Sequence, residues 1–162
     1  MNDPARAVDL NRTVLETVAV DDSGDWWTGV VRYRPRHGSG SRLRLERYVE
    51  NGGGVQLAHR WRVRSEFWTD ERDAVARFRK YGGDSPPALP ISDFFDVREY
   101  TEIRNDRTRW VGVSRIEGQY GRDKARLYHW DPSDRTTEQK WTVGKHWSRL
   151  ARVATRMLAE GA

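Results

Sequence analysis

The sequence contains no cysteine and little lysine: of its 29 basic residues only 4 are lysines, and the rest are arginines. Without cysteine the chain has no disulfide scaffold, no thiolate zinc or iron–sulfur site and no thiol catalysis. No apolar run approaches the ~20 residues of a membrane-spanning helix, and residues 1–10 contain no apolar signal core. We therefore expect a soluble, cytoplasmic protein.

The composition that remains indicates a folded, basic chain. Its 162 residues provide length for one ordinary domain or two small ones. Aromatic residues make up 11% of the chain, including 8 tryptophans, whereas disordered chains are poor in aromatic residues. Basic residues outnumber the 24 acidic ones and give a net charge of +5. This excess favours an acidic partner such as a nucleic acid.

An internal repeat divides the chain into halves. The segment Trp27–Arg32, WTGVVR, returns in the second half as Trp110–Arg115, WVGVSR. Three further pairs follow in the same order: residues 43–48 with 125–130, residues 61–63 with 141–143, and Trp68 with Trp147. Because four matching blocks in one order do not arise from composition alone, we interpret the pattern as a duplication.

Hydrophobic periodicity and turn residues predict the same order of elements in both halves. The expected strands lie near residues 12–20, 26–34, 42–49, 55–63, 95–104, 109–117, 124–130 and 138–143. The expected helices lie near residues 66–81 and 145–160, where apolar residues recur at helical spacing.

These elements predict an α+β fold built from two ββββα repeats, residues 12–82 and 94–162. Each repeat is expected to form an antiparallel four-stranded sheet with a C-terminal helix, and the two are expected to form an intramolecular pseudo-dimer. Residues 83–93 contain three prolines, which disfavour both helix and strand, and are expected to form a linker. Residues 1–11 are expected to form a flexible tail.

Alternation along the strands predicts one apolar and one basic sheet face. In the fourth strand, Trp61 and Val63 share a face, and Arg60 and Arg62 share the other. The apolar face is expected under the helix, leaving the basic face to solvent or a ligand. Four tryptophans are expected in the core: Trp61, Trp68, Trp141 and Trp147. For Trp26 and Trp130, core packing and ligand contact are equal alternatives.

Rows of basic residues interleaved with aromatic ones are typical of proteins that bind single-stranded nucleic acid. Guanidinium groups bind phosphates, and exposed aromatic rings stack on bases for ~1–3 kcal/mol each, whatever the base. The candidate nucleic-acid-binding residues are Arg32, Arg34, Arg42, Arg44, Tyr48, Arg60, Arg62, Arg109, Arg115, Lys124, Arg126, Tyr128, Trp130 and Lys140.

One stretch resembles a known family. Residues 126–132, RLYHWDP, are followed by Trp141-Thr142-Val143 and by Trp147 at the start of an amphipathic segment. This order resembles the positive cofactor four family of single-stranded-DNA-binding transcriptional coactivators. The repeat architecture is similar to that of Whirly proteins, which carry two ββββα units in one chain. The first repeat departs from the motif, with Val49-Glu50-Asn51-Gly52 in place of Asp-Pro.

The resemblance implies a function. It places Arg126 on a DNA-contacting arginine of the family and Arg44 at the equivalent position of the first repeat. It implies a single-stranded-DNA-binding protein with little sequence preference, acting in transcription or DNA maintenance at the nucleoid. Further assembly of the pseudo-dimer into a homo-oligomer is left open.

Two other binding functions and one enzymatic function are weighed against this hypothesis. The same surface suits RNA or, in a protein-interaction module, an acidic protein. No catalytic residue, metal or cofactor is expected, because the histidines at 37, 59, 129 and 146 form no metal-type pair. A two-metal nuclease would use clustered carboxylates. The candidates for that role are Asp70, Glu71, Asp73, Asp93, Asp96 and Glu99, which we interpret as surface groups.

Overall fold

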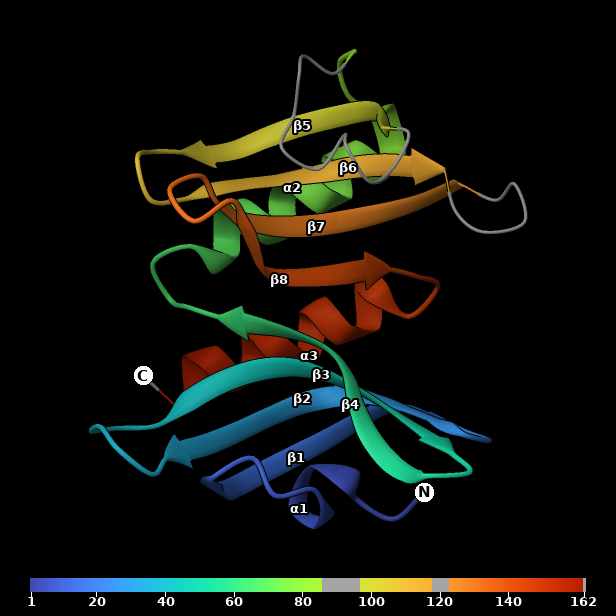
Figure 1. Ribbon diagram of the computed structural model, residues 1–162, viewed down its shortest axis with the longest axis vertical. Coiled ribbons are helices and arrows are strands. Elements are labelled where there is room, and N and C mark those ends of the chain that lie inside the picture. Colours follow the sequence, from blue (N-terminus) through green and yellow to red (C-terminus); the bar gives the residue numbers. More distant parts are fainter. Residues whose placement is uncertain (86–96, 118–122, 162) are drawn as a thin grey trace. The chain divides into compact units, whose positions relative to one another are not determined.

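The computed structural model describes residues 1–85, 97–117 and 123–161 (Figure 1). Its strands are β1 (Arg12–Ser23), β2 (Trp26–Pro35), β3 (Arg42–Asn51), β4 (Gly54–Val63), β5 (Val97–Asn105), β6 (Trp110–Glu117), β7 (Asp123–Asp131) and β8 (Thr136–Val143). Its helices are α1 (Pro4–Ala7), α2 (Trp68–Tyr81) and α3 (Trp147–Glu160). Every expected strand and both expected long helices are present. None of the described helices is long and apolar enough to cross a membrane.

The expected pair of separate sheets is wrong. All eight strands belong to one antiparallel sheet, in the order β1-β2-β3-β4-β8-β7-β6-β5, instead of two four-stranded sheets in a pseudo-dimer. Side-chain alternation identifies a strand and its two faces. It does not say whether the free N–H and C=O groups of an outer strand pair with another strand. The local pattern therefore predicts the strands correctly and the sheet incorrectly.

The chain divides into two compact units. Unit 1 is Met1–Trp68 together with the segment from Lys145 onward, and unit 2 is Thr69–Gly144. Unit 1 therefore contains β1–β4 with α3, and unit 2 contains β5–β8 with α2 beyond Trp68. The expectation that each four-stranded half carries its own following helix is also wrong. An amphipathic pattern shows that a helix needs a sheet to cover, but not which sheet.

Tryptophans hold α3 in unit 1. Trp68 donates its Nε1–H to Thr155 Oγ1 at 3.0 Å, and its ring centroid lies 6.0 Å from that of Trp147. Beneath the helix, Leu45 is paired with Trp61 across β3 and β4, and both side chains are almost fully buried. The core positions expected for these three tryptophans are confirmed.

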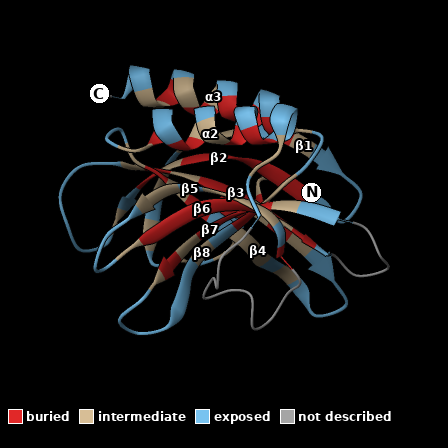
Figure 2. Cartoon of the chain, turned by 90° about the horizontal axis from the view of Figure 1, so that it is seen from above, coloured by how far each residue is buried: buried red, intermediate tan, exposed pale blue. Residues whose placement is uncertain are grey.

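Charged and aromatic contacts hold α2 in unit 2. Arg104 Nη2 lies 2.7 Å from Glu71 Oε2, and both side chains are largely buried. The Arg115 guanidinium lies 5.4 Å from the ring centroid of Phe78, within range of a cation–π contact. Figure 2 shows buried residues concentrated in β2, β3, β6 and β7, whereas the described turns between strands are largely exposed.

The repeat is visible in the strand pairing. Leu45 faces Trp61 in unit 1, and Leu127 faces Trp141 in unit 2, where Trp141 is 1% exposed as expected for a core residue. In both pairings the register then shifts two residues beyond the leucine. Equivalent residues of the two repeats therefore occupy equivalent positions within their four strands.

Packing explains the repeated Trp-x-Gly motif. A β-carbon built on Gly29 would lie 2.6 Å from Cη2 of Trp27, and one on Gly112 would lie 2.7 Å from Cη2 of Trp110. Residues two apart in a strand share a face, and in both units the tryptophan ring lies over its own glycine. Only glycine leaves room for the ring at this position.

Candidate nucleic-acid interface

Each unit has one sheet face packed by its long helix and a second face, which we call the distal face. In unit 1, Arg44 and Arg62 are paired across β3 and β4 and alternate with the helix-side residues Leu45 and Trp61. The cations of the distal face are Arg42, Arg44, Arg60 and Arg62 in unit 1, and Lys124, Arg126 and Lys140 in unit 2. The predicted alternation thus places seven of the expected cations on this face.

The accessible cations of unit 1 lie on β3 and β4. Arg60 is exposed, and Arg42 and Arg62 are half-buried. Partial burial and the neighbouring charges of Arg64 and Arg42 lower the pKa of Arg62 below its ordinary value. Like charges gathered in this way create a local field that attracts anions.

The accessible cations of unit 2 occupy equivalent positions. Lys124 and Lys140 are both exposed, and Lys140 is paired with Tyr128 across β7 and β8. Partial burial and the adjacent charge of Arg126 lower the pKa of Lys140. Both units therefore carry positive charge on the distal face of their third and fourth strands.

Arg44 and Arg126, which the resemblance led us to expect as DNA contacts, are held by internal contacts. Arg44 Nε donates to Glu46 Oε2 at 2.6 Å, and its guanidinium lies 5.2 Å from the ring centroid of Tyr33. Arg126 is 9% exposed and donates its Nε–H to Thr142 Oγ1 at 3.0 Å. A phosphate would have to displace these contacts, so their expected role as leading phosphate ligands is not supported by the geometry.

The aromatic residues expected to stack on bases are buried. Tyr48 is 0% exposed, Tyr128 is 2% exposed and Trp130 is 6% exposed. Tyr128 and Trp130 pack with Trp110 in a hydrophobic cluster. Stacking needs an accessible ring face, so the assignment of these three residues to base contact is wrong. Trp26, the other tryptophan for which core packing and ligand contact were equal alternatives, is 45% exposed.

The N-terminal segment covers part of the distal face of unit 1. Residues 4–7, which lie within the expected tail, form α1. Ala5 packs with Trp27, Tyr33 and Tyr48 in a buried cluster on β2 and β3. Val55 and Leu57 at the start of β4 also pack against this cluster, whereas the exposed Arg60 further along β4 is not part of it.

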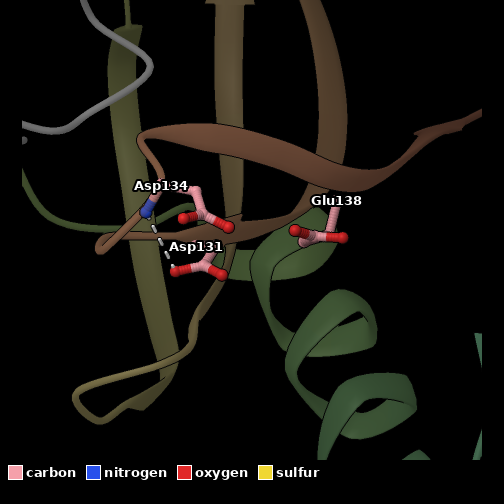
Figure 3. Close-up of side chains that lie close together, drawn as sticks. All are labelled: Asp131, Asp134 and Glu138. Carbon is pink, nitrogen blue, oxygen red and sulfur yellow. Dashed lines mark hydrogen bonds between the residues drawn. The ribbon is translucent and has the colours of Figure 1, made fainter.

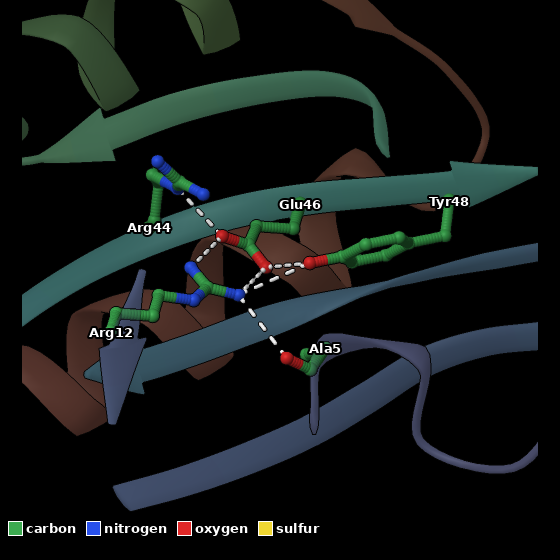
Figure 4. A network of polar contacts seen from close by, with 5 residues as sticks. All are labelled: Ala5, Arg12, Arg44, Glu46 and Tyr48. Carbon is green, nitrogen blue, oxygen red and sulfur yellow. Dashed lines mark hydrogen bonds and ion pairs between the residues drawn. The ribbon is translucent and has the colours of Figure 1, made fainter. Parts of the chain in front are cut away.

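Under α1 lies a buried ionic network (Figure 4). The Glu46 carboxylate is fully buried and accepts hydrogen bonds from both Arg12 and Arg44, the first as a two-pronged contact. The Tyr48 hydroxyl donates to Glu46 Oε1 at 2.6 Å, and Arg12 Nη2 also lies 3.5 Å from the carbonyl of Ala5. A buried carboxylate is stable only with such partners.

The network fixes the protonation state of its members. Burial alone would raise the pKa of Glu46, but the hydrogen bond from Arg12 and the charge of Arg44 outweigh it and hold this pKa below its ordinary value. Burial and the negative charge of Glu46 raise the pKa of Tyr48. Glu46 is therefore ionised and Tyr48 protonated at neutral pH, as their hydrogen bond requires.

The remaining expected cations lie away from the distal face. Arg32 donates to the carbonyl of Met157 in α3, and Arg115 is ion-paired on the helix side of unit 2. Arg34 is exposed near the end of β2, and Arg109 is half-buried just before β6. The equivalent residues Arg32 and Arg115 thus both support a helix of their own unit.

Of the carboxylates considered for a nuclease, four are described, and Asp70 among them is an exposed residue of α2. Glu71, Asp73 and Glu99 each form an ion pair with an arginine. Asp93 and Asp96 lie outside the described residues. No role beyond these ion pairs is inferred for this group.

A different acidic group lies around the turn between β7 and β8, with one carboxylate from the end of β7, one from the turn and one from β8 (Figure 3). One carboxylate oxygen each of Asp131, Asp134 and Glu138 lies within 4.8 Å of the others. Asp131 accepts hydrogen bonds from the backbone and hydroxyl of Ser133, and these lower its pKa. Asp131 therefore organises the turn, and the exposed group alone does not define a metal site.

Sequence reasoning missed the partners of the basic rows. Glu46 shares the parity of Arg44 and Tyr48, and this was the signal of a buried ionic network. Arg12 joins that network from β1, which no local pattern indicates. Arg64 follows the last residue of β4 and was not among the expected cations.

The chain was compared with known proteins, and no family model, curated protein or solved structure matches it. The resemblance to the positive cofactor four family therefore rests on the short motif in the sequence.

Proposed function

We propose that this protein binds single-stranded DNA with little sequence preference, through phosphate contacts made by the distal faces. The observation that carries the proposal is the placement of cations at equivalent positions of both units, Arg42 and Arg60 in unit 1 and Lys124 and Lys140 in unit 2. Unit 1 adds Arg62, where unit 2 has Thr142. Among the described residues, Arg60, Lys124 and Lys140 form no ion pair.

The burial of the aromatic residues determines what kind of binding is expected. Phosphate contacts position a nucleic acid but carry no sequence information. With Tyr48, Tyr128 and Trp130 covered, these three rings of the distal faces do not stack on bases, and counterion release from phosphates dominates the affinity there. The expected binding is therefore insensitive to sequence and steeply dependent on salt.

The proposal is tested by fluorescence anisotropy with a labelled oligothymidine across a salt series. We expect R60Q/R62Q to weaken binding about tenfold or more at low salt. Each single-strand phosphate contact contributes ~0.7 to the slope of log K against log salt, so this variant reduces the slope by about 1.4. K124Q/K140Q is expected to act in the same way.

The matched control is R77Q/R152Q, which removes the same charge from exposed positions on α2 and α3. It is expected to change affinity little. If both double variants and the control behave alike, charge placement is irrelevant and the proposal fails. Equal binding of oligouridine would extend the ligand class to RNA, because guanidinium–phosphate contacts do not read the 2′-hydroxyl. No binding at low salt would leave an acidic protein as the partner.

A further inference from the structure

A pocket of about 270 Å³ opens in unit 1 where β3 begins and β4 ends, beside the last turn of α3. Its polar lining includes four arginines and two serines: Arg32, Arg42, Arg62, Arg64, Ser41 and Ser65. The apolar part of its wall comes from β3, β4 and α3. Such a concentration of guanidinium groups around one small cavity is the chemistry of an anion site.

The positive charge of this pocket is only partly balanced. Arg32 donates a hydrogen bond to the carbonyl of Met157, and its Nε lies 3.7 Å from Glu16 Oε2. Arg42 and Arg64 form no ion pair with any described residue. Glu66 is the one carboxylate of the lining, against four guanidinium groups.

Electrostatic repulsion within the pocket points the same way. Partial burial and the charges of Arg64 and Arg42 together lower the pKa of Arg62, and the opposing attraction of Glu66 is smaller. An anion between these groups would remove the repulsion, and it would be held by donors from several directions.

The size and donors of the pocket favour a phosphate group. Its volume is slightly below the ~300–1,000 Å³ of pockets that enclose drug-sized molecules. One guanidinium group can donate two parallel hydrogen bonds to a phosphate, and the hydroxyls of Ser41 and Ser65 are further donors. A phosphomonoester carries about −1.5 to −2 charges at pH 7, whereas an internal phosphodiester carries one. A cluster of several arginines therefore discriminates in favour of the monoester.

We propose that this pocket binds a phosphomonoester, supplied by the terminal phosphate of a DNA strand. The inference rests on the proposed function, because a strand on the distal face of unit 1 lies beside Arg42 and Arg62, which belong to both sites. A free nucleotide or inorganic phosphate offers the same chemistry, so the test separates these sources.

The experiment compares oligothymidines that carry a 5′-phosphate, a 3′-phosphate or no terminal phosphate. We expect a terminal phosphate at one of the two ends to strengthen binding about tenfold relative to the unphosphorylated strand. A gain of this size corresponds to one set of charge-assisted hydrogen bonds. R64Q is expected to abolish that preference, with a smaller loss of affinity for the unphosphorylated strand through its part in the local positive field. R60Q, outside the pocket, is the matched control and is expected to weaken all three strands equally. S65A provides a second pocket variant with an unchanged charge.

The unfolding temperature with inorganic phosphate or thymidine monophosphate completes the test, because a ligand that binds the folded state raises it. If neither compound nor a terminal phosphate has an effect, the pocket proposal is overturned while single-stranded binding stands. A different result is that no strand binds, but inorganic phosphate or thymidine monophosphate raises the unfolding temperature of the wild type and not of R64Q. In that case the terminal phosphate of a DNA strand is excluded as the source of the phosphomonoester. That result contradicts the proposed binding of single-stranded DNA but supports the pocket as a phosphomonoester site.

Discussion

Replacing Glu46 by glutamine is expected to lower the free energy of unfolding by about 3–5 kcal/mol. Glu46 is fully buried and is the acceptor shared by Arg12, Arg44 and Tyr48. The substitution keeps the shape of the side chain but leaves two largely buried guanidinium groups without their counter-charge. Urea denaturation followed by tryptophan fluorescence measures the loss.

A second glutamate gives the matched comparison. Glu99 also pairs with an arginine, Arg115, at 2.8 Å, but both side chains are about one-third exposed. E99Q is therefore expected to cost less than about 1 kcal/mol. In unit 1, R12M/E46Q should be less destabilised than the sum of its single variants, because it removes a buried charge together with its partner. Additive losses would contradict the network.

The same carboxylate predicts a pH dependence. The folded-state pKa of Glu46 lies below its ordinary value, so its ionisation contributes stability that is complete above the unfolded-state pKa. That stability is lost as pH falls below about 4.5 through the folded-state pKa. Wild-type stability should therefore fall more steeply with acid than that of E46Q. Parallel acid profiles for the two proteins would exclude Glu46 as the titrating group.

Replacing Gly29 by alanine is expected to destabilise the protein by about 1–3 kcal/mol. The added β-carbon would meet the carbonyl oxygen of Val18 at 2.4 Å and the ring of Trp27 at 2.6 Å. The backbone carbonyl cannot rotate away, so either the strand or the indole must shift. Thermal unfolding monitored by circular dichroism reports the effect.

The equivalent glycine provides a graded comparison. At Gly112 the ring of Trp110 lies 2.7 Å from the added carbon, but the nearest backbone oxygen, of Thr101, lies at 3.0 Å. G112A should therefore be less damaging than G29A. Gly52, with no atom within 4 Å of an added carbon, is the control and should tolerate alanine. A loss at G52A equal to that at G29A would refute the packing explanation.

Local order was well predicted because it depends on local chemistry. Two-residue alternation located Trp61 and Trp141 in the core, and the repeated Trp-x-Gly segments marked equivalent strands. The sheet and the allocation of helices were not predictable in this way, because they depend on which surfaces meet. An amphipathic stripe on α3 fits any apolar sheet face, and only the three-dimensional structure shows it on β1–β3.

The sequence pattern predicted which side chains share a sheet face, but not which of them are accessible. Alternation correctly grouped Arg44 with Arg62 and Arg126 with Lys140 on one face. It could not distinguish exposed cations from those held inside, because the contacts that hold Arg44 come from Glu46 on the same strand and from the ring of Tyr33 on β2. The predicted base contacts of the aromatic residues have the same weakness. Parity places Tyr48 on a sheet face but does not show that α1 covers that residue.

The exchange of helices has a consequence for how the chain folds. Unit 1 is assembled from residues up to Trp68 and residues from Lys145 onward, and one of its contacts, from Arg32 to Met157, spans 125 positions of sequence. A nascent chain that has completed β1–β4 lacks the helix that covers them until α3 (Trp147–Glu160) has been synthesised. Contacts of such long range slow folding, and neither repeat corresponds to an autonomous folding segment. Cutting the chain at the duplication boundary would separate each sheet half from its helix.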